Sequence, residues 1–182
     1  VPTGEYTWIA RALDIGARGV MVPMVESRAQ AERLAQSCRY PGVGRRGAAF
    51  GFAQCDYMGG DVAEKMRQYH ERTLLIAQIE TEKGLENVEE IAAVDGVDVL
   101  WVGHFDLSNF MGIPAQFDHP KFTAAMTHVA QVARKHGKVA GFMATDQVWI
   151  ERAKGMGYTM LAAGTDTGLM QQAFGQLIDG IN

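Results

Sequence analysis

Short apolar runs alternate with amphipathic stretches along the whole chain. The runs are nearly continuous in apolar residues, which is typical of strands that are covered on both faces. They predict five strands, at about residues 19–25, 73–80, 97–103, 138–143 and 158–163, and Val1-Pro2 fits the end of a sixth. Because strand and helix alternate through short turns, we expect repeated βαβ units and a parallel sheet of the α/β class.

Two of the intervening helices carry explicit start signals. Ser27 is expected to cap one helix, with Gln30 as its capping-box partner. Asp118 is expected to cap another, with Pro120 in its first turn. Further helices are expected at about residues 5–16, 61–71, 84–93, 146–156 and 166–180. Residues 39–60 are rich in glycine and lack any period, which is typical of a functional or mobile loop.

Composition narrows the class of protein. Of the 182 residues, 47% are hydrophobic and 21% are charged, which is ordinary for a globular domain and argues against disorder. The net charge of −4 means that basic residues are not in excess, as they would be in a protein that binds nucleic acid or an anionic membrane. No apolar run approaches the roughly 18 residues that span a bilayer. Cys38 and Cys55 form no close-spaced metal or redox motif, so we expect a reduced, cytoplasmic protein.

The strongest candidate chemistry lies at the end of the strand predicted at 73–80. Side chains alternate along a strand, so Gln78 and Glu80 share a face with Ile76, while the residues between them face the helices. In α/β barrels and open parallel sheets, chemistry takes place at the carboxyl ends of the strands. We therefore expect a carboxamide and a carboxylate at the mouth of the sheet.

A second carboxylate follows the next strand, which ends in Gly103-His104-Phe105-Asp106. If the two strands pair, Glu80 and Asp106 converge on one point. Two carboxylates with free positions for water and substrate oxygens make a site for a hard cation. The alternative is structural: Glu80 pairs with an arginine, and Asp106 caps the short helix that follows it.

Two motifs carry a resemblance to a known family. They are Gln78-Ile79-Glu80-Thr81 and Gly103-x-x-Asp106-Leu107-Ser108. In this order and spacing they resemble the motifs of the HpcH/HpaI aldolase/citrate lyase family, the metal-dependent class II pyruvate aldolases. The resemblance covers the whole chain, with further blocks within residues 13–25, 39–47, 94–98 and 163–167.

This resemblance implies a (β/α)8 TIM barrel and a divalent cation, Mg²⁺, Mn²⁺ or Co²⁺, held by Glu80 and Asp106. It implies that Gln78 donates a hydrogen bond to bound pyruvate and that the backbone N–H groups of Phe105 and Asp106 hold the pyruvate carboxylate. In the family the cation polarises the ketone and stabilises the enolate that then attacks an aldehyde. The implied protein is an aldehyde-lyase (EC 4.1.2-type) acting on pyruvate or a related 2-oxo acid, in a homo-oligomer that is a hexamer by analogy.

Two parts of the family's site have no counterpart in these residues. The family uses an arginine directly before the proline that matches Pro2, and a histidine further upstream, so the catalytic residues stay unassigned. A barrel of this kind typically has about 250 residues. We therefore expect residues 1–182 to form a single (β/α)-barrel domain that lacks its first two to three strands, or roughly 70 residues.

Several positions keep two interpretations. His104 stands where many members have proline, and it either contacts substrate or packs behind the loop. Met143 either lines the aldehyde pocket or belongs to the core. Residues 54–57 stand where some relatives have an arginine, so aldehyde recognition does not carry over directly. Thr165 either caps the last helix or helps to bind a phosphate.

Two other functions stay open at this point. One is an acyl-CoA lyase of the same superfamily, similar to citrate lyase beta or malyl-CoA lyase, for which a basic rim would be expected. The other is a non-catalytic barrel fragment that serves in assembly. A Schiff-base aldolase is disfavoured, because Lys138 starts its strand instead of ending it.

Overall fold

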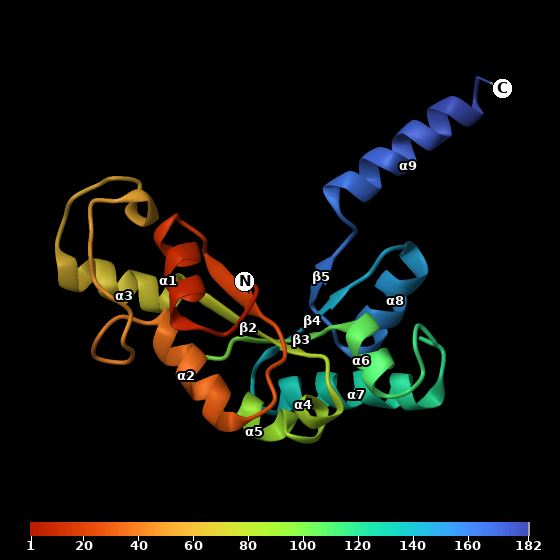
Figure 1. Cartoon of the computed structure of the whole chain (residues 1–182), viewed down its shortest axis with the longest axis horizontal. Coiled ribbons are helices and arrows are strands. Elements are labelled where there is room, and N and C mark those ends of the chain that lie inside the picture. The colour runs from red at the N-terminus through yellow and green to blue at the C-terminus, as the bar shows by residue number, and fades with distance from the viewer. Residues whose placement is uncertain (182) are drawn as a thin grey trace.

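The computed structural model describes residues 1–181, which build one curved sheet of five parallel strands (Figure 1). The strands lie side by side in chain order: β1 (Gly19–Val22), β2 (Leu74–Ile79), β3 (Val99–Val102), β4 (Val139–Met143) and β5 (Met160–Ala162). In this register Gln78 pairs with Trp101, and Gly141 pairs with Met160. The five predicted strands and their parallel arrangement are confirmed.

Helices connect these strands and begin within two residues of their predicted starts. They are α1 (Tyr6–Asp14), α2 (Arg28–Cys38), α3 (Val62–Arg72), α4 (Glu82–Glu86), α5 (Val88–Ala92), α6 (His104–Phe110), α7 (Pro120–Lys135), α8 (Gln147–Met156) and α9 (Asp166–Asp179), with a 3₁₀ turn η1 (Ala53–Cys55). Two details of the prediction are wrong. The helix expected at 84–93 is divided at Asn87, and α7 is capped by His119. The Asp118 carboxylate is instead paired with Arg152 at 2.6 Å.

The first strand is shorter than its apolar run. Pairing stops at Val22, because the backbone soon turns away and Met24 adopts the left-handed conformation, with φ of 51°. The amino group of Val1 donates to the Met21 carbonyl at 3.0 Å, beside β1. Val1 is nevertheless outside the strands, so the sixth strand is not found within residues 1–181.

The sheet separates two clusters of buried side chains. On its outer face, Leu75 and Ile79 pack in the large cluster formed with the helices, of which α1, α2 and α7 contact the strands directly. On its inner face, Ile76 packs with Val99 and Trp101. The alternation predicted for β2 is therefore confirmed, and the inner face leads to the end of the strand where Glu80 follows.

Two segments extend beyond this layered body, and the first is the long loop with α3 (Figure 1). Residues 39–60 have no regular structure apart from η1, but they are anchored at several points. Tyr40 packs edge-on against Tyr69 of α3. Arg46 is buried and forms an ion pair with Asp14 at 2.6 Å. Arg46 thus fixes the loop to the end of α1.

The second segment is α9, which projects away from the sheet (Figure 1). None of its residues is buried, and it exposes an apolar stripe with helical spacing, formed by Met170, Phe174, Leu177 and Ile178. Ile181, just after the helix, is exposed as well. Thr165 caps α9 by accepting a hydrogen bond from the Gly168 N–H at 3.1 Å. Among residues 1–181, no helix is both long enough and apolar enough to cross a membrane.

Candidate functional site

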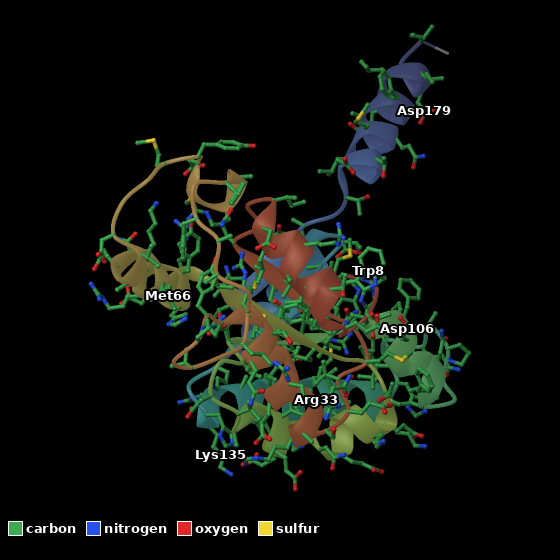
Figure 2. The ribbon with its side chains drawn as sticks, turned by 60° about the vertical axis from the view of Figure 1, so that its left-hand side comes forward. Trp8, Arg33, Met66, Asp106, Lys135 and Asp179 are labelled. Atoms are coloured by element: carbon green, nitrogen blue, oxygen red, sulfur yellow. The ribbon has the colours of Figure 1, made fainter. Side chains whose placement is uncertain are left out.

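The carboxyl ends of β2 and β3 bring the predicted site residues together. Gln78 lies in β2, and Glu80 follows the last residue of that strand. Gly103 follows β3 and donates its N–H to the Ile79 carbonyl at 3.2 Å, which extends the pairing of the two strands. Asp106 lies in the first turn of α6, directly beyond this point (Figure 2).

Glu80 is a buried carboxylate with one oxygen committed and one left free. Its side chain is 3% exposed, and Oε1 accepts the backbone N–H of Met24 at 2.8 Å. Within residues 1–181, Oε2 accepts no hydrogen bond and Glu80 forms no ion pair, so the arginine partner of the structural alternative is not found. Burial raises the pKa of Glu80, the Met24 N–H opposes this, and the negative charge of Asp106 raises it further.

Gly103 provides the space in which Glu80 and Gln78 meet. A Cβ atom on Gly103 would overlap Glu80 Oε2, and it would lie 2.8 Å from Gln78 Nε2. Its φ of −83° is available to any residue, so space, and not backbone conformation, requires glycine here. The free oxygen of Glu80 and the amide of Gln78 therefore point to the same small cradle.

Asp106 complements this arrangement from α6. It is exposed, and Gly103, not Asp106, occupies the N-cap position of α6, without any side-chain cap. The capping role in the structural alternative is therefore not observed. Burial is the main cause that raises the pKa of Glu80, and the negative charge of Asp106 adds to it.

This donor set fits a divalent cation. It contains two carboxylates, one of them with an unpartnered oxygen, and hard cations prefer oxygen ligands and keep water or substrate oxygens as further ligands. Residues 1–181 hold no group of three or more His, Cys, Asp or Glu side chains arranged around one point. Two protein carboxylates therefore leave most coordination positions to small molecules.

Phe105 and Met143 lie around this centre in different ways. Phe105 is 57% exposed, and its ring lies edge-on to that of Phe117, with 5.2 Å between the ring centroids. Its side chain thus packs against Phe117, and its backbone lies beside Asp106 in the first turn of α6. Met143 ends β4 and packs on the inner cluster with Trp101. Both of its interpretations, core and pocket wall, are compatible with this place.

His104 packs behind the site. Its ring lies 4.7 Å from that of Phe105 and 5.2 Å from those of Phe117 and Phe142. Phe142 belongs to the helix-side cluster, so His104 is on the outer side of the sheet. Burial lowers the pKa of His104, and the charge of Asp106 opposes this. This position matches packing behind the loop, although no side-chain hydrogen bond of His104 is found in the described residues.

Three contributors to the site were missed by the sequence analysis. They are the Met24 N–H, the cradle at Gly103, and the loop at residues 23–27 that directs the Met24 N–H at Glu80. The apolar run 19–25 gave the opposite signal, since it predicted a straight strand. Met24 could only have been found from its left-handed backbone, which has no sequence signature in a non-glycine residue.

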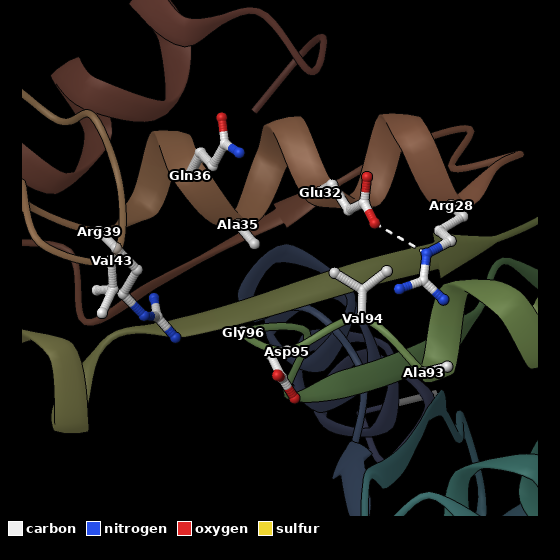
Figure 3. A pocket seen from close by; sticks show the side chains of 10 residues that line it. All are labelled: Arg28, Glu32, Ala35, Gln36, Arg39, Val43, Ala93, Val94, Asp95 and Gly96. Atoms are coloured by element: carbon white, nitrogen blue, oxygen red, sulfur yellow. Dashed lines mark hydrogen bonds and ion pairs between the residues drawn. The ribbon is translucent and has the colours of Figure 1, made fainter.

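A separate groove lies between α2 and the turn before β3 (Figure 3). Its volume is about 470 Å³, and it contains none of the predicted site residues. Arg28 at one end is paired with Glu32 at 2.8 Å, and Arg39 at the other is paired with Asp98 at 3.2 Å. Because its basic side chains are already paired, we place no site there.

Fold and site together define a class of protein. They comprise consecutive strands of a (β/α) barrel, with acidic and amide side chains at the carboxyl ends of two neighbouring strands, where such barrels carry their active sites. The chain belongs to the HpcH/HpaI aldolase/citrate lyase family, whose model matches residues 1–173. This confirms the family that the motifs indicated.

Individual relatives agree with this assignment. The chain is 37% identical over 174 residues to hydroxypyruvate/pyruvate aldolase from Pseudomonas aeruginosa, covering 96% of this chain and 65% of the relative. It is 36% identical over 179 residues to 5-keto-4-deoxy-D-glucarate aldolase from Shigella dysenteriae serotype 1, covering 98% and 69%. The crystal structure of an HpcH/HpaI aldolase from Desulfitobacterium hafniense matches with a TM-score of 0.93 at 31% identity, covering 100% and 70%. The barrel fold is thus confirmed, and the chain spans about two thirds of the length of these relatives.

Proposed function

We propose that this protein is a metal-dependent class II aldolase, which forms or cleaves the carbon–carbon bond between a 2-oxo acid and an aldehyde. The observation that carries the proposal is the placement of buried Glu80 and of Asp106 just after the neighbouring strands β2 and β3, with Glu80 Oε2 beside Gln78 and without a hydrogen bond in residues 1–181. Membership of the family supports the same chemistry, since relatives at 36% and 37% identity are named as aldolases.

Each residue has a distinct task in this proposal. Glu80 and Asp106 hold Mg²⁺, Mn²⁺ or Co²⁺, and the bound cation supplies the positive charge that makes the methyl protons of a 2-oxo acid acidic. Gln78 donates a hydrogen bond that orients the 2-oxo acid. The N–H groups of Phe105 and Asp106 hold its carboxylate, because the first N–H groups of a helix have no intrahelical partner. No residue among 1–181 is assigned as the general base.

The proposed 2-oxo acid is pyruvate or a close relative such as hydroxypyruvate. The name of the Pseudomonas relative includes both compounds, which supports this choice. Met143, at the end of the neighbouring strand β4, is proposed to bound the space for the aldehyde. An acyl-CoA thioester is the second candidate substrate class, and the activity test below separates the two.

Exchange of pyruvate methyl protons in D₂O by the full-length protein tests the proposal. We expect exchange with Mn²⁺ or Mg²⁺, loss of exchange with EDTA, and loss of exchange in Glu80→Gln. Glu151→Gln, on the exposed face of α8, is the matched control and should exchange like the wild type. Exchange that survives EDTA or Glu80→Gln overturns the metal-dependent mechanism. Cleavage of a carbon–carbon bond in an acyl-CoA substrate, with the thioester left intact and without pyruvate exchange, favours the acyl-CoA lyase. The absence of both activities favours a role in assembly alone.

We further propose that residues 1–182 belong to a single barrel domain that assembles with copies of itself, as a hexamer by analogy with the family. The exposed apolar stripe of α9 supports an interface between copies, because stripes of this size are normally covered. A cytoplasmic location is proposed from Cys38 and Cys55, which are both buried and unpaired.

A further inference from the structure

The loop between β1 and α2 supplies the one hydrogen bond to the Glu80 side chain that is found in residues 1–181. The donor is the N–H of Met24, at 2.8 Å from Glu80 Oε1. Met24 has φ of 51°, a left-handed backbone that non-glycine residues rarely adopt. Such a conformation persists only where the surroundings hold it in place. The orientation of Glu80 therefore depends on whatever holds Met24.

The side chain of Gln30 makes that restraint. Its Nε2 donates to the Met24 carbonyl at 3.0 Å, and its Oε1 accepts the Glu26 N–H at 2.9 Å. Both polar groups of one carboxamide are thus used within three consecutive residues. Because both bonds are made by one planar carboxamide, held from the first turn of α2, the Met24 carbonyl and the Glu26 N–H are kept at a fixed separation.

The other side of the loop is anchored to the segment that carries the site. The Val25 N–H donates to the Gln78 carbonyl at 3.2 Å, and Asn87 Nδ2 donates to the Glu26 carbonyl at 2.8 Å. Thr81 Oγ1 donates to Glu26 Oε1 at 2.9 Å. The Val25 N–H and the Met24 carbonyl belong to one peptide unit, so the Gln78 carbonyl restrains that peptide from one side and Gln30 from the other. Within residues 1–181, Gln30 supplies the side-chain hydrogen bond to this peptide.

We propose that Gln30 is a positioning residue for the cation site. It holds Met24 in the left-handed conformation, the Met24 N–H fixes Oε1 of Glu80, and Oε2 is thereby left for the cation. The inference rests on the proposed function for the identity of the ligand. It also explains why the Gln30 carboxamide reaches back past Ser27, where a simple capping box would end.

Mn²⁺ titration of the full chain by calorimetry tests the inference. We expect Gln30→Ala, and Gln30→Met with a side chain of similar length, to bind Mn²⁺ about 10- to 100-fold more weakly, the usual effect of losing a group that orients a ligand. Ser27→Ala is the matched control. It removes the cap of the same helix, where Ser27 accepts the Gln30 N–H at 3.3 Å, but leaves the bonds to Met24 and Glu26 intact. Its Mn²⁺ affinity should stay within about twofold of the wild type.

Amide hydrogen exchange of the metal-free protein supplies a second readout. The Met24 amide should exchange faster in Gln30→Ala and Gln30→Met than in the wild type and Ser27→Ala. Wild-type affinity and an equally slow Met24 amide in both Gln30 variants would overturn this inference alone. A wild type that binds no Mn²⁺ would overturn the proposed function, and the role of Gln30 at a cation site with it.

Discussion

Glu80 is a carboxylate whose surroundings do little to stabilise its negative charge. It is buried, it has one backbone hydrogen bond, and a second carboxylate lies near it. Burial without full hydrogen bonding and a neighbouring like charge both disfavour the ionised form. A bound cation removes both penalties at once. At the residue scale, the unfavourable environment of the ionised Glu80 carboxylate is the physical argument for a bound metal ion.

Gly103→Ala tests the cradle. The added Cβ would overlap Glu80 Oε2 and press on Gln78 Nε2, so Mn²⁺ affinity should fall at least about tenfold in a calorimetric titration. Gly155→Ala is the matched control, since it lies in α8 with no atom within 4 Å of the added Cβ. Unchanged affinity in Gly103→Ala would show that the two side chains do not depend on this space.

His70 gives the protein a pH-dependent stability. Burial and the positive charge of Arg39 lower the pKa of His70, and its Nε2 accepts the Tyr40 N–H at 3.0 Å, which requires a neutral ring nitrogen. The unfolded chain therefore binds the proton more readily than the folded state. This contribution is complete above the ordinary pKa of about 6.5 and declines as the pH falls from there through the lowered pKa.

Urea unfolding of the wild type and His70→Gln at about pH 7.5 and about pH 5.5 checks this. The glutamine oxygen can accept the Tyr40 N–H at both pH values, so the variant should lose less stability on acidification. His128→Gln, at an exposed position of α7, is the control and should behave like the wild type. An equal loss in the wild type and His70→Gln would exclude His70 as the source.

At the scale of elements, the strands were predictable because their apolar runs and alternation are local. The same is true of the Ser27 cap, whose hydroxyl accepts the Gln30 N–H. The failures depend on contacts between distant segments. The helix predicted at 84–93 breaks at Asn87, where the side chain turns to the Glu26 carbonyl 61 residues away. Asp118 does not cap α7, because its carboxylate forms an ion pair with Arg152 of α8.

The same contrast between local patterns and long-range contacts applies to the site. Gln78, Glu80 and Asp106 could be predicted because they occupy strand ends in a regular pattern. Met24 and Gln30 could not be assigned their tasks, since an αL backbone and a back-reaching carboxamide depend on the packed loop. Gln30 was expected only to complete a capping box, and its Oε1 accepts from Glu26 instead of Ser27.

Gly141→Ala probes how closely β3 and β4 pack on the inner face. The added Cβ would overlap the ring of Trp101, which fills the space above Gly141. Urea unfolding should show that the free energy of unfolding falls by about 1–3 kcal/mol, the usual effect of overpacking a core. Gly175→Ala in exposed α9 meets no atom within 4 Å and should be neutral or stabilising. A Gly141→Ala protein as stable as the wild type would mean that the Trp101 ring moves freely.

At the scale of the whole molecule, α9 stands out as the helix of residues 1–181 that has no buried residue. Four of its large apolar residues, Met170, Phe174, Leu177 and Ile178, are each more than half exposed and follow one another with helical spacing. In sedimentation velocity experiments, we expect Phe174→Glu to shift the protein to smaller species. Gln172→Glu, on the opposite face of α9, should sediment like the wild type. A wild-type monomer, or an unchanged assembly in Phe174→Glu, would contradict a role of α9 in assembly.

In the proposed function, Glu80 and Asp106 together bind a divalent cation at the mouth of the barrel. Anomalous diffraction from crystals of the protein grown with Mn²⁺ tests it most directly. We expect one strong anomalous peak within coordination distance of both carboxylates, and we expect this peak to disappear in Glu80→Gln. A peak elsewhere, or no peak at a Mn²⁺ concentration that supports pyruvate proton exchange, would contradict it.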